Sequence, residues 1–179
     1  MPKIVDHDQR RSELLAKCLD LFTEKGYSAV TTRELARVTG VSTGILYHYF
    51  ASKEDLFSQL MRYFVEKVTT ELSDAIVRGR NPEARLALAV RYLDTKEEEF
   101  ASYLLILTDY ARCVGMGRFY EELDFHRAES ALLELLSSSL GMSSEQARKT
   151  LTYLMGLLII RFLTGKKGSL ASEASVMIP

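Results

Sequence analysis

Apolar residues recur at intervals of three and four along nearly the whole chain, which is the spacing of helices with one buried face. The first such stripe, at positions 14, 15, 18, 19 and 22, predicts a helix that stops at Gly26. No stretch shows the strict alternation typical of a strand, and only three prolines interrupt the chain. The pattern therefore predicts an all-α protein.

Capping residues divide the N-terminal third into short helices. A hydroxyl residue followed three positions later by a carboxylate can satisfy two free backbone N–H groups at a helix start. Gly40 permits the left-handed backbone of a turn, so we expect the second helix to end there. Three short helices thus precede a longer fourth one. The predicted starts of the second, third and fourth helices are marked by Thr31 with Glu34, by Ser42, and by Ser52 with Asp55, respectively.

Longer helices follow in the rest of the chain, separated by glycines and by Pro82, which suits a first helical turn. We expect helices over residues 52 to about 78, 97–114, 119–140 and 143–163. The remaining tail is small and polar, so we expect it to lack regular structure. The predicted domains are a domain of three short helices over 1–51, a domain of longer helices over 52–165, and a flexible tail over 166–179. The features described below assign a helix-turn-helix and DNA binding to the first domain, and ligand binding and dimerisation to the second.

Composition excludes several classes of protein. The 179 residues are 47% hydrophobic and 26% charged, which is an ordinary globular mixture. The formal net charge of -1 provides no overall field toward nucleic acid or membrane, so such binding needs a local patch. Cys18 and Cys113 lack metal-ligand spacing, and we expect no metal, no cofactor and a cytoplasmic location. The apolar stretch 151–163 is shorter than a membrane span, and no membrane contact is expected.

The segment from Thr31 to Phe50 has the features of a helix-turn-helix. Ala36 is small where two helices must approach closely, and Gly40 fits the turn. If Val41, Leu46 and Phe50 point inward, the third helix presents short polar groups and rings outward. An α-helix with such a face fits the major groove of B-DNA. The outward positions are then Thr43, Gly44, Tyr47 and His48.

Four runs in this region together resemble the signature of the tetracycline-repressor (TetR) family of regulators. The resemblance covers about residues 8–65 and departs at Tyr49, where many members have His. Beyond this region only the helical character, the order of helices and the length agree. The runs are Leu21–Tyr27, Thr31–Ala36, Gly40–Phe50 and Ser52–Leu56.

The resemblance implies a homodimer whose third helices enter successive major grooves of a double-stranded, pseudo-palindromic DNA operator. It implies a base or phosphate contact for Arg33 and a phosphate contact for Lys53. Without the resemblance, Arg33 and Lys53 would be interpreted as ordinary solvated side chains. Tyr47 would be interpreted as an aromatic residue that covers the core. Residues 1–64 hold nine Lys or Arg and eight Asp or Glu, so overall charge predicts only modest non-specific DNA binding. The distinction between the operator and other DNA must therefore come from individual, well-positioned contacts. The expected DNA-binding residues are Thr31, Thr32, Arg33, Thr43, Gly44, Ile45, Tyr47, His48 and Lys53.

Large, adaptable side chains are dense between positions 100 and 126. They can line a pocket between helices, or they can form a filled core. The resemblance implies a small-molecule effector in this domain, and the side chains favour an apolar or aromatic one, with Arg91, Arg112 or His126 orienting a polar group. The pocket candidates are Tyr103, Leu107, Tyr110, Cys113, Met116, Phe119, Tyr120, Phe125 and His126.

The last two predicted helices are apolar on more than one face, so they need cover on both sides. Pairing with the same helices of a second chain would provide it, and Gly156 would allow a close approach. A monomer with one very buried helix is the alternative. The interface candidates are Leu132, Leu136, Leu140, Leu151, Leu154, Met155, Gly156, Leu158 and Phe162.

These features and the resemblance together predict a ligand-responsive transcriptional regulator, and the resemblance implies that it is a repressor. Effector binding would shift the fourth helix and change the spacing of the two third helices of the dimer. A regulator controlled by a protein partner, and a helical protein-interaction module, are the alternatives. No nucleophile, acid–base pair or metal set is visible, so no catalytic residue is assigned and an enzyme is not expected.

Overall fold

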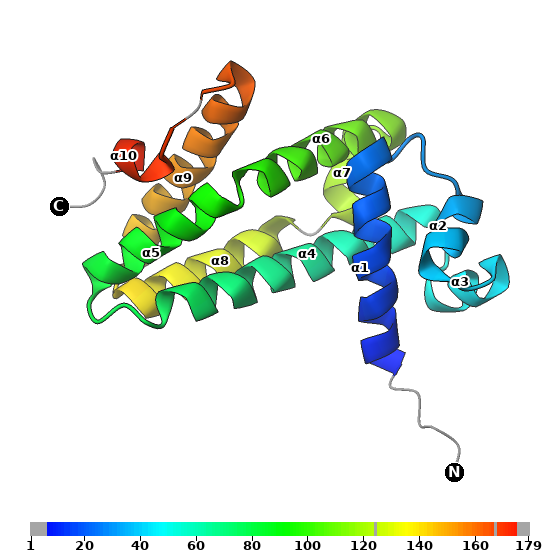
Figure 1. The fold of residues 1–179 in the computed structure, drawn as a ribbon, viewed down its shortest axis with the longest axis horizontal. Coiled ribbons are helices and arrows are strands. Elements are labelled where there is room, and N and C mark those ends of the chain that lie inside the picture. Colours follow the sequence, from blue (N-terminus) through cyan, green and yellow to red (C-terminus); the bar gives the residue numbers. More distant parts are fainter. Residues whose placement is uncertain (1–6, 124, 167, 175–179) are drawn as a thin grey trace, which may run out of the picture. The chain divides into compact units, whose positions relative to one another are not determined.

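The computed structural model describes residues 7–123, 125–166 and 168–174, and all regular structure in these ranges is helical. Figure 1 follows the helices in chain order. This confirms the predicted all-α fold class. The helices are α1 (His7–Lys25), α2 (Thr32–Thr39), α3 (Thr43–Tyr49), α4 (Lys53–Ile76), α5 (Pro82–Thr95), α6 (Glu97–Val114), α7 (Met116–Glu122), α8 (Phe125–Leu140), α9 (Ser144–Thr164) and α10 (Leu170–Ala174).

Side-chain caps define the short N-terminal helices as the sequence predicts. Thr31 and Glu34 form a reciprocal capping box at the start of α2. Gly40 ends α2 with φ 73°, a left-handed conformation that glycine adopts without a steric penalty. Ser42 then caps α3, where its hydroxyl accepts a hydrogen bond from the Ile45 amide at 3.2 Å. These caps fix a turn of three residues between α2 and α3.

Two predictions about the C-terminal half are wrong. The helix expected over 119–140 is divided, because Leu123 has an extended backbone (φ −101°, ψ 109°) and is buried between α7 and α8. The tail expected to lack structure contains α10, whose Leu170 and Ala174 are completely buried. Burial of these two side chains stabilises a five-residue helix that has little intrinsic stability. Residues 167 and 175–179 of the expected tail lie outside the described residues.

The chain forms two compact units. Among the described residues, the N-terminal unit comprises 7–65 and 104–123, and the C-terminal unit comprises 66–103, 125–166 and 168–174. Helices α4 and α6 therefore each contribute to both units. These compact units differ from the functional boundaries that we expect after residues 51 and 165, which stay a prediction.

An aromatic cluster forms the centre of the N-terminal unit. Tyr110 of α6 packs against both Tyr27 and Phe57, with ring centroids 4.7 and 4.4 Å away. Phe57 also meets the edge of Phe22 at 5.6 Å. The Tyr110 hydroxyl donates to the carboxylate of Glu122 in α7. The second half of α6 and α7 thus complete the core beneath the N-terminal helices.

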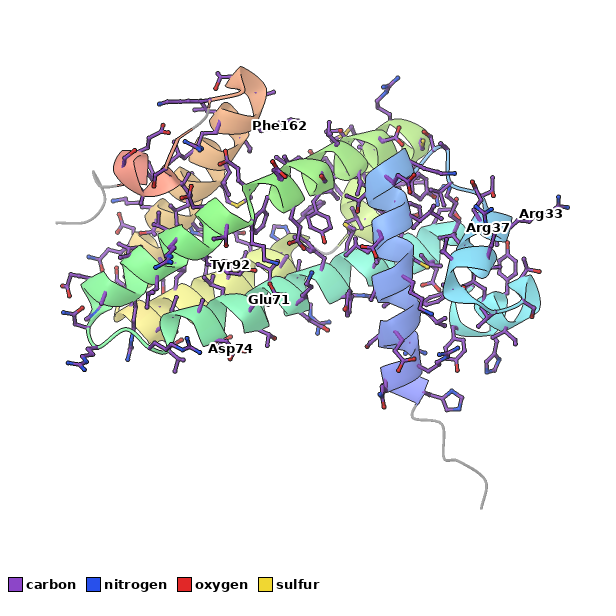
Figure 2. The ribbon with its side chains drawn as sticks, in the orientation of Figure 1. Arg33, Arg37, Glu71, Asp74, Tyr92 and Phe162 are labelled. Atoms are coloured by element: carbon purple, nitrogen blue, oxygen red, sulfur yellow. The ribbon has the colours of Figure 1, made fainter. Side chains whose placement is uncertain are left out.

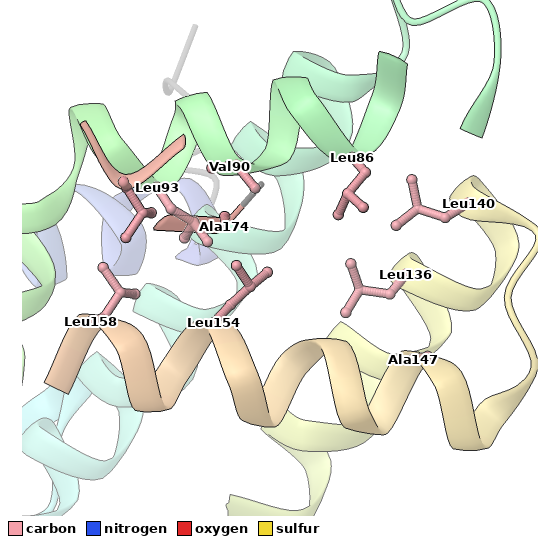
Figure 3. Packing of buried hydrophobic residues seen from close by; sticks show 10 residues of the cluster. Leu86, Val90, Leu93, Leu136, Leu140, Ala147, Leu154, Leu158 and Ala174 are labelled. Atoms are coloured by element: carbon pink, nitrogen blue, oxygen red, sulfur yellow. The ribbon is translucent and has the colours of Figure 1, made fainter. Parts of the chain in front are cut away.

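In the C-terminal unit, leucines of α5, α8 and α9 form a core that α10 covers. Ala174 of α10 lies beside Leu93 of α5 and near Leu154 and Leu158 of α9 (Figure 3). Tyr92 of α5 faces α4, and its hydroxyl donates to the Glu71 carboxylate at 3.1 Å (Figure 2). None of the described helices combines the length and the apolar character that a membrane span requires.

A buried arginine holds α10 in place. Arg161 of α9 is 2% exposed, and its guanidinium forms two 2.8 Å hydrogen bonds to the carboxylate of Glu97. It also donates to Glu173 of α10 and, at 2.6 Å, to the carbonyl of Gly168. Asp94 of α5 accepts a 2.7 Å hydrogen bond from the Leu170 amide at the start of α10. Arg161 therefore links α6, α9 and α10 within one unit.

Candidate DNA-binding surface

Helix α3 is anchored by apolar residues on one side and exposed on the other. Leu46 and Phe50 are 2% and 1% exposed, respectively, as the sequence predicts, and Val41 is half-buried. The outer face consists of short polar groups, one glycine, aromatic rings and one aliphatic side chain. The exposed residues of this face are Thr43, Gly44, Ile45, Tyr47 and His48.

The start of α2 lies beside this face. The hydroxyl oxygens of Thr32 and Tyr47 are 3.4 Å apart, so the end of the Tyr47 side chain lies beside the start of α2. Arg33 is exposed, and its side chain extends outward from α2 (Figure 2). Thr32, Arg33 and Tyr47 therefore belong to one exposed surface. At this position the Arg33 guanidinium can donate two hydrogen bonds to a base edge or a phosphate.

Lys53, the first residue of α4, packs on Tyr27. Its Nζ lies 4.3 Å from the centroid of the ring, in the geometry of a cation–π interaction. Burial lowers the pKa of Lys53, although the carboxylates of Glu54 and Asp109 oppose this effect. The side chain is half-buried, so its ammonium is held at a defined place at the start of α4. The free backbone N–H groups of a helix start also favour an anion, so the ammonium and these amides can bind the same phosphate.

Thr31 has a structural task as well as its predicted contact. Its hydroxyl accepts from the Glu34 amide at 3.3 Å and lies 2.8 Å from a Glu34 carboxylate oxygen, to which it donates. The Thr31 amide and the Lys25 ammonium donate to the same carboxylate at 2.9 and 2.7 Å, respectively. These donors, Lys25 first, lower the pKa of Glu34 to about 2. The cap therefore contains an ionised carboxylate bound to a lysine.

We expect the cap to contribute to the pH dependence of stability. The ionised form of Glu34 stabilises the fold above its ordinary pKa of 4.5, and this contribution is lost as the pH falls toward 2. Glu34→Gln keeps an acceptor for the Thr31 amide but cannot titrate. The loss of stability from pH 5 to pH 3 should be smaller in this variant, measured as the urea midpoint by circular dichroism.

Glu24→Gln, at an exposed position in α1, is the matched control and should keep the wild-type pH profile. Identical profiles for Glu34→Gln and the wild type would contradict the assignment of the cap.

Asp109 positions the turn before α2 from a distance in sequence. Its carboxylate accepts a 2.7 Å hydrogen bond from the Ser28 amide, 81 residues away. This hydrogen bond contributes most to a lowered pKa of Asp109. A Cβ at Gly26 would lie 3.1 Å from the same carboxylate, and Gly26 has φ 80°, so the close approach requires glycine. Sequence spacing contains no signal for this contact.

The pocket candidates are divided between the two units. Tyr110 is completely buried, and its ring and hydroxyl already have partners within the N-terminal unit. Phe119 and Leu107 are half-buried, whereas Cys113, Met116 and Tyr120 are exposed. Tyr103, which is buried, and Phe125 and His126, which are exposed, belong to the C-terminal unit. The predicted pocket stays a prediction. Among the described residues, no three His, Cys, Asp or Glu side chains gather so that they could hold a metal ion.

Four of the predicted interface residues are in the core instead. Leu136, Leu140, Leu154 and Leu158 are 3–4% exposed and pack within the C-terminal unit, so they are not available to a second chain. Leu132, Leu151, Met155, Gly156 and Phe162 are half-buried. The sequence pattern missed the most exposed apolar residues of α9, because it cannot separate two apolar faces of one helix. These residues are Ile159, Ile160 and Leu163, which are 38%, 58% and 73% exposed.

The N-terminal unit defines a class: three short helices, the second and third joined by a tight glycine turn, form a helix-turn-helix protein. Residues 14–60 match the family model described as "Bacterial regulatory proteins, tetR family". These residues are therefore similar to the DNA-binding domain of the TetR family.

Two curated relatives have names that agree with this class. The HTH-type transcriptional regulator PksA of Bacillus subtilis is 32% identical over 55% of this chain and 48% of its own length. The HTH-type transcriptional repressor KstR2 of Mycobacterium tuberculosis is 32% identical over 63% of this chain and 56% of its own length. The chain spans about half the length of these relatives. Both are transcriptional regulators, which agrees with the expectation that the chain is not an enzyme.

Solved structures share the fold over nearly the whole chain. A TetR transcription regulator from Haloarcula marismortui has a TM-score of 0.75 at 20% identity and covers 96% of this chain and 97% of its own. A TetR-family transcriptional regulator from Streptomyces coelicolor has a TM-score of 0.66 at 20% identity, with 94% and 95% covered. The all-α architecture beyond residue 60 is therefore that of TetR-type structures.

Proposed function

We propose that the protein is a dimeric transcriptional repressor that binds a pseudo-palindromic DNA operator and is released by a small apolar or aromatic effector. The observation that carries the proposal is the exposed face of α3 beside Arg33 at the start of α2. A buried anchor of Leu46 and Phe50 holds this face rigidly. The name of KstR2, a repressor, supports repression as the outcome.

The contacts on this face suit base reading. Arg33 can donate two hydrogen bonds to guanine, and Ile45, which is 48% exposed, can contact a thymine methyl group. Lys53 and the start of α4 offer positive charge and free amides to a phosphate. Each good base contact contributes about 1–3 kcal/mol, so a few in each half-site suffice for operator recognition.

The test is the selection of binding sites from random duplex DNA, followed by fluorescence anisotropy on the selected duplex. We expect binding that survives scrambled competitor and weakens steeply with salt, because lysine and arginine contacts release counterions. The selected sites should contain two half-sites about one helical turn apart. Failure to enrich any sequence would favour a helical protein-interaction module instead.

We assign the dimer interface to the outer face of α9. Ile159, Ile160 and Leu163 expose a continuous apolar strip there, at positions three and four residues apart. A second copy of the same strip would cover it by two-fold symmetry, as an isologous interface requires. The half-buried Met155 and Gly156, one turn earlier, extend the same proposed interface.

Charge on this strip should dissociate the dimer. Ile160→Glu and Leu163→Glu, combined, place two carboxylates opposite their own copies, and we expect a monomer in sedimentation velocity with an unchanged circular dichroism spectrum. Val77→Glu, which alters another apolar residue, 69% exposed, is the matched control and should stay dimeric. A dimeric double variant would place the interface elsewhere.

Effector binding between the middle helices would shift α4 and so separate the two α3 helices of the dimer. This requires that the effector binds the DNA-bound and the released states with different affinity. A thermal-shift screen of apolar and aromatic compounds, followed by operator anisotropy with each hit, tests it. Hits that stabilise the protein without weakening operator binding would favour control by a protein partner.

A further inference from the structure

Helix α10 is attached to the C-terminal unit by few contacts. Leu170 and Ala174, one helical turn apart, are completely buried, whereas Ala171 and Ser172 are exposed. The Leu170 amide donates to the carboxylate of Asp94 at 2.7 Å. A helix of five residues has little intrinsic stability, so these contacts and its bonds to Arg161 keep it in place. Helix α10 is therefore bound to its unit much as a short peptide is bound to a protein.

The surface that α10 covers combines apolar side chains with a buried cation. Leu154, Leu158 and Arg161 recur at intervals of four and three residues, so they share one face of α9. Ala174 of α10 lies near these two leucines and beside Leu93 of α5 (Figure 3). Helix α10 thus places a small apolar side chain on the leucines and, one residue earlier, a carboxylate on the arginine.

The guanidinium of Arg161 binds α10 and its own core through different edges. Its Nε and Nη2 each donate to the carboxylate of Glu97 at 2.8 Å. Its Nη1 donates to the carboxylate of Glu173, and Nη2 also donates to the carbonyl of Gly168 at 2.6 Å. The edge formed by Nη1 and Nη2 therefore faces α10 and the chain before it. Two N–H groups on one edge of a guanidinium match the two oxygens of a single carboxylate.

Displacement of α10 would leave this surface without two kinds of partner. The leucines would lose their apolar cover, which is unfavourable in water. The outer edge of Arg161 would lose its carboxylate, and a buried cation without its counter-charge is costly. Lys166, which donates to Glu173 at 2.8 Å, would lose the same partner. One molecule with a carboxylate and an apolar body would satisfy both requirements.

We propose that the surface beneath α10 is a binding site for a small apolar carboxylic acid, and that α10 occupies this site when the ligand is absent. The carboxylate of the ligand replaces Glu173 and the Gly168 carbonyl on Arg161, and its apolar part replaces Leu170 and Ala174. Glu97 keeps its own bonds to the arginine. The site goes beyond the proposed function, because its residues all belong to the C-terminal unit and ligand binding does not require DNA.

Competition with α10 then determines the apparent affinity. If the ligand binds only to molecules in which α10 is displaced, the apparent dissociation constant is the intrinsic constant divided by the fraction of such molecules. Substitutions that weaken the attachment of α10 increase this fraction and therefore tighten ligand binding. A helix with a purely structural role would show no such gain. The direction of the change thus distinguishes the two roles.

The experiment uses the full chain, with 4-phenylbutyrate as the probe and 4-phenylbutanol as its uncharged counterpart. Calorimetric titration at neutral pH without DNA should show one site per chain for the carboxylate. The alcohol has the same apolar body but cannot neutralise Arg161, so we expect it to bind at least about ten-fold more weakly. Equal affinities of the two compounds would contradict the assigned role of the arginine.

Two variants weaken α10 without changing the surface beneath it. Leu170→Ala removes most of an apolar anchor, and Glu173→Gln removes the carboxylate from Arg161. Each should increase the affinity for 4-phenylbutyrate by about ten-fold or more, because α10 is displaced in more molecules. Leu140→Ala is the matched control for lost stability, since Leu140 is a buried leucine of the same cluster but lies beside Leu86, away from Ala174 (Figure 3). This variant should bind with the wild-type affinity.

Hydrogen exchange measures the displacement of α10 directly. The amides of residues 168–174 should exchange faster in the presence of saturating 4-phenylbutyrate, because the bound ligand holds α10 away from its unit. Binding with unchanged or slower exchange in this segment would overturn the proposal. Absence of binding to the wild type and to both α10 variants would also overturn it. Operator binding is not involved in any of these measurements, so their failure would leave the proposed DNA-binding function unaffected.

Discussion

Arg161→Met should lower the free energy of unfolding by about 3 kcal/mol. The substitution keeps an apolar stem of similar length but leaves the carboxylates of Glu97 and Glu173 facing each other without their shared cation. The Glu97 carboxylate then loses its buried cation, which is costly, whereas Glu173 keeps an ion pair with Lys166 at 2.8 Å. It also removes the donor to the Gly168 carbonyl, which holds the chain before α10. Urea denaturation monitored by circular dichroism measures the change.

Arg148→Met is the matched control on the same helix. Arg148 is also bonded to a glutamate, Glu129, but both side chains are exposed, at 61% and 41%. An exposed ion pair contributes less than about 1 kcal/mol, so this variant should unfold close to the wild type. Equal effects of the two substitutions would mean that Arg161 does not hold α10 through a buried network.

Arg33→Ala should reduce operator affinity by about 30-fold or more. One base contact contributes about 1–3 kcal/mol, and a dimer loses it in both half-sites. Tyr47→Ala should have an effect of the same order, because the ring lies on the outer face of α3 and is 51% exposed. Neither side chain is in the core, so thermal unfolding of both variants should stay near that of the wild type. Anisotropy on the selected duplex measures the loss.

Arg62→Ala serves as the charge-matched control for Arg33→Ala. Arg62 is exposed on α4, about 14 Å along the helix axis from Lys53. Its removal should change affinity less than three-fold, since it contributes only long-range attraction. A loss equal to that of Arg33→Ala would indicate that overall charge, and not placed contacts, accounts for binding.

Local chemistry made the N-terminal helices predictable. Thr31, Ser42 and Gly40 act on amides and turns a few residues away, so their effect is visible in the sequence. The exposed and buried faces of α3 also followed from spacing alone, because Leu46 and Phe50 are anchored while Tyr47 and His48 are not.

Contacts between distant segments were not predictable in this way. Asp109 and Ser28 meet only after the chain has folded, and neither has a sequence feature that identifies its partner. The same limit applies to α10, whose residues look polar and small until Arg161 and Asp94 provide partners. Apolar patterns also failed to distinguish Leu154, in the core, from Ile160, on the surface. Both fit a helical stripe.

The discontinuous N-terminal unit has a consequence for the order of synthesis. The helix-turn-helix leaves the ribosome first, yet its aromatic cluster lacks Tyr110 until more than half of the chain has been made. Until then, Tyr27 and Phe57 have an apolar neighbour missing, and Ser28 has no carboxylate for its amide. The helix-turn-helix is therefore expected to reach its final packing only after residues 104–123 have been made.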